Sequence, residues 1–120
     1  MTMVSEELPA VSRVQIARFA GAVRDFNPIH VDETFATQQA GQPSVVAHGP
    51  LIISLAVDRM GAALGHDRLV GFDARVRRPV YPGDVLTVSV DENLVVAVTN
   101  QNGVVVVDGL LELAQDAGHE

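Results

Sequence analysis

The sequence contains no cysteine and no tryptophan, and only 4% of its 120 residues are aromatic. The absence of cysteine excludes disulfides, thiolate metal ligands and a cysteine nucleophile. Because aromatic residues are so few, we expect valine, leucine, isoleucine and alanine to form the core. Hydrophobic residues make up 48% of the chain and charged residues 19%, a balance that favours a globular fold over disorder.

Basic residues are also scarce: the chain has eight of them and 15 acidic residues, so its formal net charge is −7. This charge argues against nonspecific binding to nucleic acid, whose phosphates the surface would repel. The longest apolar stretch, GPLIISLAV, is too short to span a bilayer, and the first residues lack a secretory signal pattern. We therefore expect a cytoplasmic protein with no nucleic-acid or membrane partner, folded as one domain over residues 1–120.

Helical patterns occupy the first half of the chain. Ser12 is a candidate N-cap for a first helix, which the Asn-Pro pair at residues 27–28 should end. A second, short helix is expected from about Asp32, whose carboxylate suits an N-cap, to Gly41. A third begins at Pro50 and is apolar nearly all round, which predicts a buried helix.

Strand patterns fill the second half, in the segments LVGFDARVRRPVY, DVLTVSVDE, LVVAVTN and VVVVDGLLELA. Turn-forming sequences separate these segments, so neighbouring strands are expected to run antiparallel. A short N-terminal strand could join the same sheet. We predict an α+β fold in which a curved antiparallel sheet wraps around one long apolar helix.

The run DFNPIHVDETFA places Asp25, Asn27 and His30 close together in the chain. A turn at Asn-Pro can bring the carboxylate and the imidazole to one place, where such a pair can activate a water molecule and move its proton. The alternative is helix punctuation, in which the aspartate ends a helix and the histidine faces solvent. His30 and Asp32 alone offer too few ligands for a metal site.

The segment AHGPL, residues 47–51, places Gly49 at the start of the third helix. The first turn of a helix has free N–H groups, and glycine allows a ligand to approach the backbone closely. Such an N–H suits an oxyanion that develops on a carbonyl, where one preorganised donor contributes roughly 3 kcal/mol. The alternative is an ordinary loop that enters a core helix.

Arg75, Arg77 and Arg78 supply three of the eight basic residues. Alternation along a strand would place the first two on one face and Arg78 on the other. These side chains could contact the phosphates of a ligand. Alternatively, they could form a solvated strand face, or a sheet edge whose charge prevents pairing with another chain. His66 and His119 are assigned no role.

Three segments, FAGAVRDFNPIHVDETFA, VVAHGPL and RRPVYPGDVL, together resemble the MaoC-like (R)-specific enoyl-thioester hydratases and dehydratases of the hotdog fold. Their order and spacing agree with that family. The resemblance implies that Asp25 and His30 are the catalytic pair, which binds one water between them. It also implies that Gly49 N–H polarises the thioester carbonyl, with Asn27 and His48 as further candidates for the oxyanion or substrate site.

Other positions receive structural roles or depart from the family pattern. Asn27 is expected to hold the turn, and Ser54 to bond a backbone carbonyl rather than to reach the site. Arg24 stands where a small residue, often glycine, precedes the catalytic aspartate in the family. Val57 stands where some relatives carry a hydroxyl on the central helix.

The resemblance also implies a dimer, because hotdog sites form between two subunits. The partner would be a second copy or another hotdog subunit, and the valine-rich run GVVVVDG would be a strand paired at a sheet edge. No metal or redox cofactor is implied.

The sequence therefore predicts a hydro-lyase that adds water to trans-2-enoyl-CoA thioesters, or removes it from (3R)-3-hydroxyacyl thioesters. A hotdog thioesterase and a noncatalytic acyl-binding subunit of a heteromeric dehydratase are the alternatives.

Overall fold

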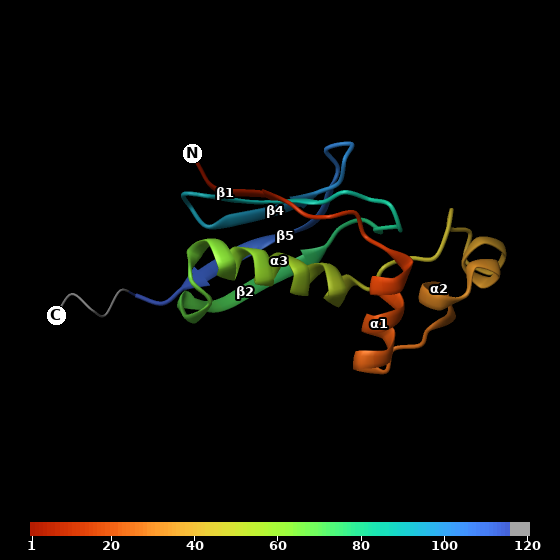
Figure 1. Ribbon diagram of the computed structural model, residues 1–120. Helices are drawn as coiled ribbons and strands as arrows, with labels where there is room; N and C mark the ends of the chain where they lie inside the picture. Colours follow the sequence, from red (N-terminus) through yellow and green to blue (C-terminus); the bar gives the residue numbers. More distant parts are fainter. Residues whose placement is uncertain (116–120) are drawn as a thin grey trace.

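The computed structural model describes residues 1–115 and combines one sheet with one long helix (Figure 1). The strands are β1 (Thr2–Glu7), β2 (Leu69–Val76), β3 (Thr87–Asp91), β4 (Val95–Thr99) and β5 (Val105–Leu113). The helices are α1 (Arg13–Val23), α2 (Pro28–Val31) and α3 (Gly49–Leu64), with a π-helical turn η1 (Phe35–Gln39) and a 3-10 turn η2 (His66–Arg68).

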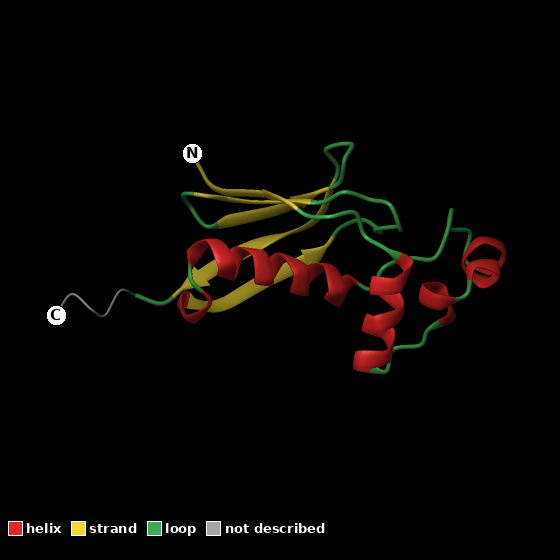
Figure 2. Cartoon of the chain, in the orientation of Figure 1, coloured by secondary structure: helices red, strands yellow, loops and turns green. Residues whose placement is uncertain are grey.

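The sheet is fully antiparallel in its recorded pairings and has the order β1-β3-β4-β5-β2. It curves around α3, while α1, α2 and η1 gather beyond the end of the sheet where α3 begins (Figure 2). This arrangement confirms the α+β hotdog fold expected from the sequence. The valine-rich strand β5 is not an edge strand, however, because it pairs with both β4 and β2.

Valines of the sheet pack against one face of α3 to form the core. Val88, Val90, Val96 and Val98 are fully buried, in one cluster with Ile52, Ala56 and Met60 of the helix. Aliphatic side chains, rather than aromatic ones, thus form the core, as predicted. The helix itself is not buried all round, since Ser54 and Asp58 are exposed on its other side.

Three other expectations differ from the structure at their boundaries. The strand predicted to continue to Tyr81 ends at Val76. The Asn-Pro turn contains the short helix α2, because proline is well suited to the first position of a helix. The helix expected from Asp32 is mostly the π-helical turn η1.

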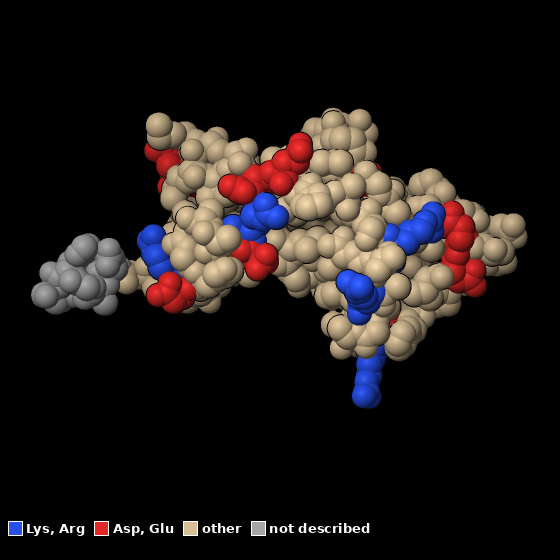
Figure 3. All heavy atoms as spheres, in the orientation of Figure 1, with Lys and Arg blue, Asp and Glu red and all other residues tan. Residues whose placement is uncertain are grey.

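None of the helices described in residues 1–115 combines the length and the apolar character that a membrane crossing requires. On the face that Figure 3 shows, the arginines of the described residues form no broad basic patch, and several lie beside acidic side chains.

Arg24 ends α1 in the left-handed conformation, with φ 59° and ψ 37°. A side chain with a Cβ costs roughly 1–2 kcal/mol in this region, whereas glycine adopts it freely. The backbone therefore gives a physical reason for a glycine preference at the position before Asp25. Arg24 is exposed, and the part of the chain that the structure describes records no ion pair for it.

Replacing Arg24 by glycine is expected to raise the free energy of unfolding by about 0.5–1 kcal/mol, after the larger unfolded-state entropy of glycine offsets part of the gain. Arg24→Ala is the matched control, because it removes the same charge but keeps the Cβ. Urea unfolding of both variants measures the difference. Equal stability of the glycine and alanine variants would contradict this explanation.

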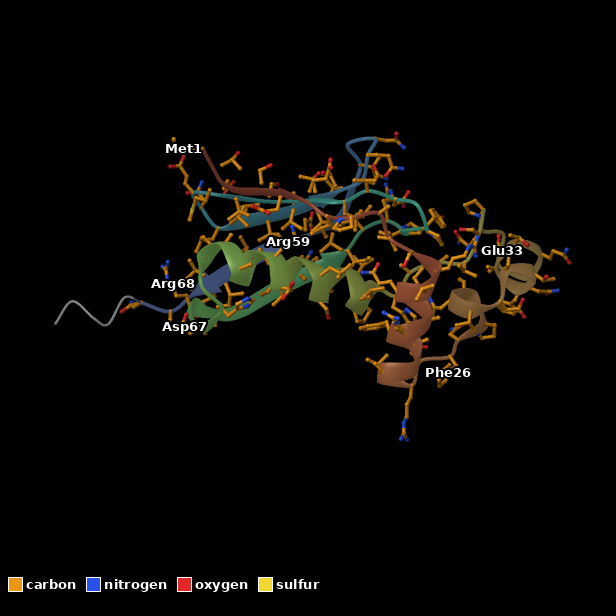
Figure 4. All side chains as sticks on the ribbon, viewed as in Figure 1. Met1, Phe26, Glu33, Arg59, Asp67 and Arg68 are labelled. Atoms are coloured by element: carbon orange, nitrogen blue, oxygen red, sulfur yellow. The ribbon has the colours of Figure 1, made fainter. Side chains whose placement is uncertain are left out.

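Glu33 connects α1 to the loop that leads into α3. Its carboxylate accepts hydrogen bonds from Arg13 Nη1 at 2.9 Å and from the backbone N–H of Val45 at 3.1 Å. The Arg13 hydrogen bond, followed by the Val45 bond, holds the pKa of Glu33 below its ordinary value of 4.5. Figure 4 shows Glu33 among the peripheral helical segments beyond α1.

Because the folded-state pKa of Glu33 is depressed, its ionised form stabilises the fold above the unfolded-state pKa, and this contribution is lost as the pH falls through the lower folded value. Glu33→Gln is expected to reduce the loss of stability on acidification from roughly pH 5 to pH 3. Denaturant unfolding across this range tests it, with Glu7→Gln on the exposed end of β1 as control. An unchanged pH dependence for Glu33→Gln would contradict the role of the carboxylate.

Candidate active site

Asp25 and His30 meet where α1 gives way to α2. Asn27 holds the turn between them, as predicted: its side-chain oxygen accepts the N–H of Ile29 at 3.1 Å, and its own N–H donates to Asp25 Oδ1 at 3.3 Å. These contacts direct the carboxylate toward the first turn of α2. The distance from Asp25 Oδ2 to His30 Nε2 is 3.9 Å.

A hydrogen bond to the backbone sets the orientation of the His30 ring. Its Nδ1 lies 2.6 Å from the carbonyl oxygen of Val46. Since a carbonyl can only accept, Nδ1 carries the proton, and in the neutral ring Nε2 has a free lone pair toward Asp25. The backbone N–H of Val46 also donates to the carbonyl of Ile29 at 3.0 Å, so two bonds join α2 to the loop before α3.

His48 lies behind His30 rather than at the surface of the site. The two imidazole rings stack with centroids 3.7 Å apart and an angle of 23° between their planes. His48 Nε2 lies 3.2 Å from the backbone carbonyl of Asp25, to which it can donate, and Phe19 packs on the same ring at 5.0 Å. His48 is only 1% exposed, and within residues 1–115 its Nδ1 has no recorded hydrogen-bond partner.

The pair is open to solvent on its Asp25 side. The Asp25 side chain is 49% exposed and that of His30 is 14% exposed. Phe26, between them in sequence, is 61% exposed and projects beyond the end of α1, away from the sheet (Figure 4). A carboxylate with solvent access next to a shielded imidazole can exchange protons with solvent.

Gly49 borders a cavity of about 370 Å³, here named the Gly49 cavity. Its walls are mainly apolar, with Ile29, Val46, Ile52 and Val107 among them, and its polar side chains are Gln42, Arg77 and Arg78.

The N–H of Gly49 is in the first turn of α3, where helical N–H groups have no intrahelical acceptor. Within residues 1–115 the structure records no acceptor for it. A Cβ at this position would lie 2.8 Å from Val76 Cγ2, closer than van der Waals contact allows. A side chain at residue 49 would therefore displace the Val76 side chain of β2, which glycine leaves in place.

The three arginines lie in different surroundings. Arg77 and Arg78 follow β2 and line the Gly49 cavity, whereas Arg75 lines a separate hollow on the sheet with Asp73 and Arg77. Arg77 Nε donates to Asp108 at 3.0 and 3.1 Å. Arg78 donates to the backbone carbonyl of Arg77, and no acidic partner is recorded for it in the described part of the chain.

Asp25, His30 and His48 offer possible ligand atoms within 4.8 Å of one another, a set that shares only His30 with the His30 and Asp32 pair considered from the sequence. The stacked rings oppose a shared metal ion in this conformation. Histidine binds a metal along an in-plane lone pair at about 2.0–2.1 Å, and two nearly parallel rings direct their lone pairs in separate planes. The arrangement therefore suits proton transfer better than metal coordination.

The remaining sequence expectations concern structural residues. Asp32 accepts the N–H of Phe35 at 3.1 Å, which confirms its capping role, and Ser54 Oγ donates to the Pro50 carbonyl at 2.8 Å. Val57 lines a hollow with Leu69 and Phe72, not the Gly49 cavity. His66 packs on α3 at Gly61. His119 is outside the described residues.

Sequence reasoning missed two features of the site. The stacking of His48 on His30 joins residues 18 positions apart, and no local pattern signals it. The hydrogen bond from Tyr81 to Gln42, at 2.6 Å, joins still more distant residues at the Gly49 cavity. The only available signal was that Tyr81 is the single tyrosine of the chain, placed before a Pro-Gly turn.

A family model and several known proteins match this chain. The family model described as the MaoC like domain matches residues 2–113. An (R)-specific enoyl-CoA hydratase of Aeromonas caviae is 35% identical over 79 residues, which cover 64% of this chain and 58% of that protein. A 3-hydroxyacyl-thioester dehydratase Y of Mycobacterium tuberculosis is 38% identical over 66 residues, which cover 52% of this chain and 23% of that protein.

A solved structure gives the same relationship. The unliganded R-hydratase PhaJ1 of Pseudomonas aeruginosa superposes with a TM-score of 0.78 at 26% identity, covering 94% of this chain and 80% of that one. The matches to the Aeromonas caviae and Mycobacterium tuberculosis proteins span less than two thirds of the length of each of those proteins. Because the family model extends from β1 to the end of β5, the chain belongs to the MaoC-like dehydratase family.

Proposed function

We propose that this protein is an (R)-specific hydratase of trans-2-enoyl-CoA thioesters, which also dehydrates (3R)-3-hydroxyacyl thioesters in the reverse direction. The observation that carries the proposal is the pair formed by Asp25 Oδ2 and His30 Nε2, with the tautomer set by Val46. Their separation of 3.9 Å is too long for a direct hydrogen bond and suits one bridging water.

In the proposed hydration, the water between Asp25 and His30 gives one proton to the pair as its oxygen bonds to C3. The electrons of the C2–C3 double bond move toward the thioester oxygen, which becomes enolate-like. When the carbonyl forms again, C2 takes a proton from the pair, so one water has been added. These steps are acid–base chemistry and require no redox cofactor.

The N–H of Gly49 is the proposed donor to the thioester oxygen. Gly49 lines the cavity, and its N–H has no recorded acceptor within the described residues, so it can donate without breaking another bond. Its position at the start of α3 adds the positive end of the helix dipole. A donor already in place stabilises the enolate-like charge without reorganisation during the reaction.

His48 is proposed to position the catalytic pair rather than to touch the substrate. Its ring supports the face of His30, and its Nε2 can hold the backbone of Asp25, so a single buried side chain contacts both members. A ring only 1% exposed has little surface to offer a substrate.

The remaining elements of the proposal concern the thioester handle and the assembly. Arg78 and Arg77, at the Gly49 cavity, are the proposed contacts for CoA phosphates, while Arg75 lies outside that cavity. The half-exposed Asp25 and the exposed Phe26 suit a second hotdog subunit that covers the site, either another copy or a related chain.

Asp25→Asn and His30→Ala are each expected to reduce hydration of trans-2-enoyl-CoA by at least about a hundredfold, because each removes one half of the proton-transfer pair. Loss of the conjugated enoyl absorbance measures turnover, and chiral analysis of the product tests the (3R) assignment. Asp32→Asn, at the cap of the next helical turn, is the control.

Normal turnover by folded Asp25→Asn and His30→Ala proteins would refute the assignment of the pair. Release of free thiol without hydration would instead indicate a thioesterase. An inactive chain that gains activity with a second subunit, but independently of Asp25, would indicate an acyl-binding subunit.

Gly49→Ala is expected to lower kcat/KM about tenfold or more, since the new Cβ would collide with Val76 and move the proposed oxyanion donor. Adding Val76→Ala removes the obstructing methyl groups and should restore most of the activity. Gly21→Ala in α1 is the control, because nothing lies within 4 Å of its new Cβ. A folded double variant as inactive as Gly49→Ala would contradict the steric explanation.

A further inference from the structure

The Gly49 cavity has one polar wall that the proposed hydration does not use. Gln42 lines this cavity, and its side-chain oxygen accepts a hydrogen bond from Tyr81 Oη at 2.6 Å. A glutamine amide also has two N–H donors on its nitrogen. The structure records no protein acceptor for these donors within residues 1–115.

Hydrogen bonds hold the main chain at both ends of the Gln42–Tyr81 bridge. The N–H of Gln42 donates to the carbonyl of Ala36 at 2.9 Å, and Ala36 is the fully buried residue of η1. The N–H of Tyr81 donates to Asp84 Oδ2 at 2.9 Å, and its carbonyl accepts the N–H of Asp84 at 3.0 Å. The main chain that carries both residues is therefore fixed, and the Tyr81 hydroxyl orients the Gln42 amide.

We propose that the Gln42 side-chain amide hydrogen-bonds an oxygen acceptor of the thioester bound in the Gly49 cavity, and so makes this cavity selective for oxygenated ligands. The inference rests on the proposed function, which places a thioester beside Gly49. A purely aliphatic ligand would cover the Gln42 N–H donors without offering them an acceptor, which is unfavourable. A ligand with an oxygen atom in reach avoids this cost.

Two parts of a thioester can supply that oxygen. One is a hydroxyl or carbonyl group on the acyl chain, and the other is an amide carbonyl of the pantetheine arm. Both present the same chemistry to Gln42. The two sources separate experimentally, because the acyl chain and the pantetheine arm can be changed one at a time.

The test measures binding of saturated thioesters, which cannot be hydrated, by titration calorimetry. In the first arm, acyl-CoAs of equal chain length carry a terminal methyl or a terminal hydroxyl group, over a series of lengths. In the second arm, an acyl pantetheine thioester is compared with an alkyl thioester that lacks the amide carbonyls. Each is measured with the unmodified protein, with Gln42→Met and with Gln39→Met, an exposed glutamine outside the cavity.

We expect the unmodified protein to prefer the oxygenated ligand of one arm by about three- to tenfold, the range for one hydrogen bond. Gln42→Met should abolish this preference, while Gln39→Met should keep it. Tyr81→Phe should weaken it, because the amide loses its anchor. The arm that shows the preference identifies the source of the oxygen.

Failure of the inference differs from failure of the proposed function. Hydration with no preference in either arm, or a preference that survives in Gln42→Met, overturns the role of Gln42 and leaves the hydratase proposal intact. A Gln42-dependent preference without hydration of any enoyl thioester overturns the hydratase proposal and supports the oxygen site. Absence of thioester binding in both arms overturns both.

Discussion

The hydrogen bond from His30 Nδ1 to the carbonyl oxygen of Val46 is the contact on which the candidate site depends. It sets the ring tautomer, and with the return bond from the Val46 N–H to Ile29 it ties α2 to the loop that leads into α3. The same loop carries His48 and then Gly49, so one short stretch of backbone positions the imidazole, its stacked support and the proposed oxyanion donor.

The fold supplies this loop with a rigid support. The valine-rich sheet packs on one face of α3, and the Val76 side chain of β2 lies so close to Gly49 that a Cβ there would collide with its methyl group. Aliphatic packing therefore determines where the first N–H of α3 lies. The polar groups of the site stand at the end of the helix, beyond the core, where Asp25 remains open to solvent and can exchange protons.

Two features at the site lower the stability of the fold. Arg24 adopts a left-handed conformation immediately before Asp25, and His48 buries a ring nitrogen for which the described part of the chain offers no hydrogen-bond partner. Burying an unpaired polar atom is unfavourable, as is a left-handed backbone with a side chain. Both costs fall on residues next to or in contact with the pair, which is typical of functional sites.

The sequence alone determined the fold class, the Ser12 and Asp32 caps, the Asn27 turn and the separation of Asp25 from His30 by one turn, because these depend on local backbone preferences and on hydrophobic periodicity. It misjudged the edge position of β5 and the end of β2, since strand order depends on long-range pairing. Only the tertiary structure decided that His48 stacks on His30, that Val76 excludes a Cβ at residue 49 and that Tyr81 holds Gln42, because each contact joins segments that folding alone brings together.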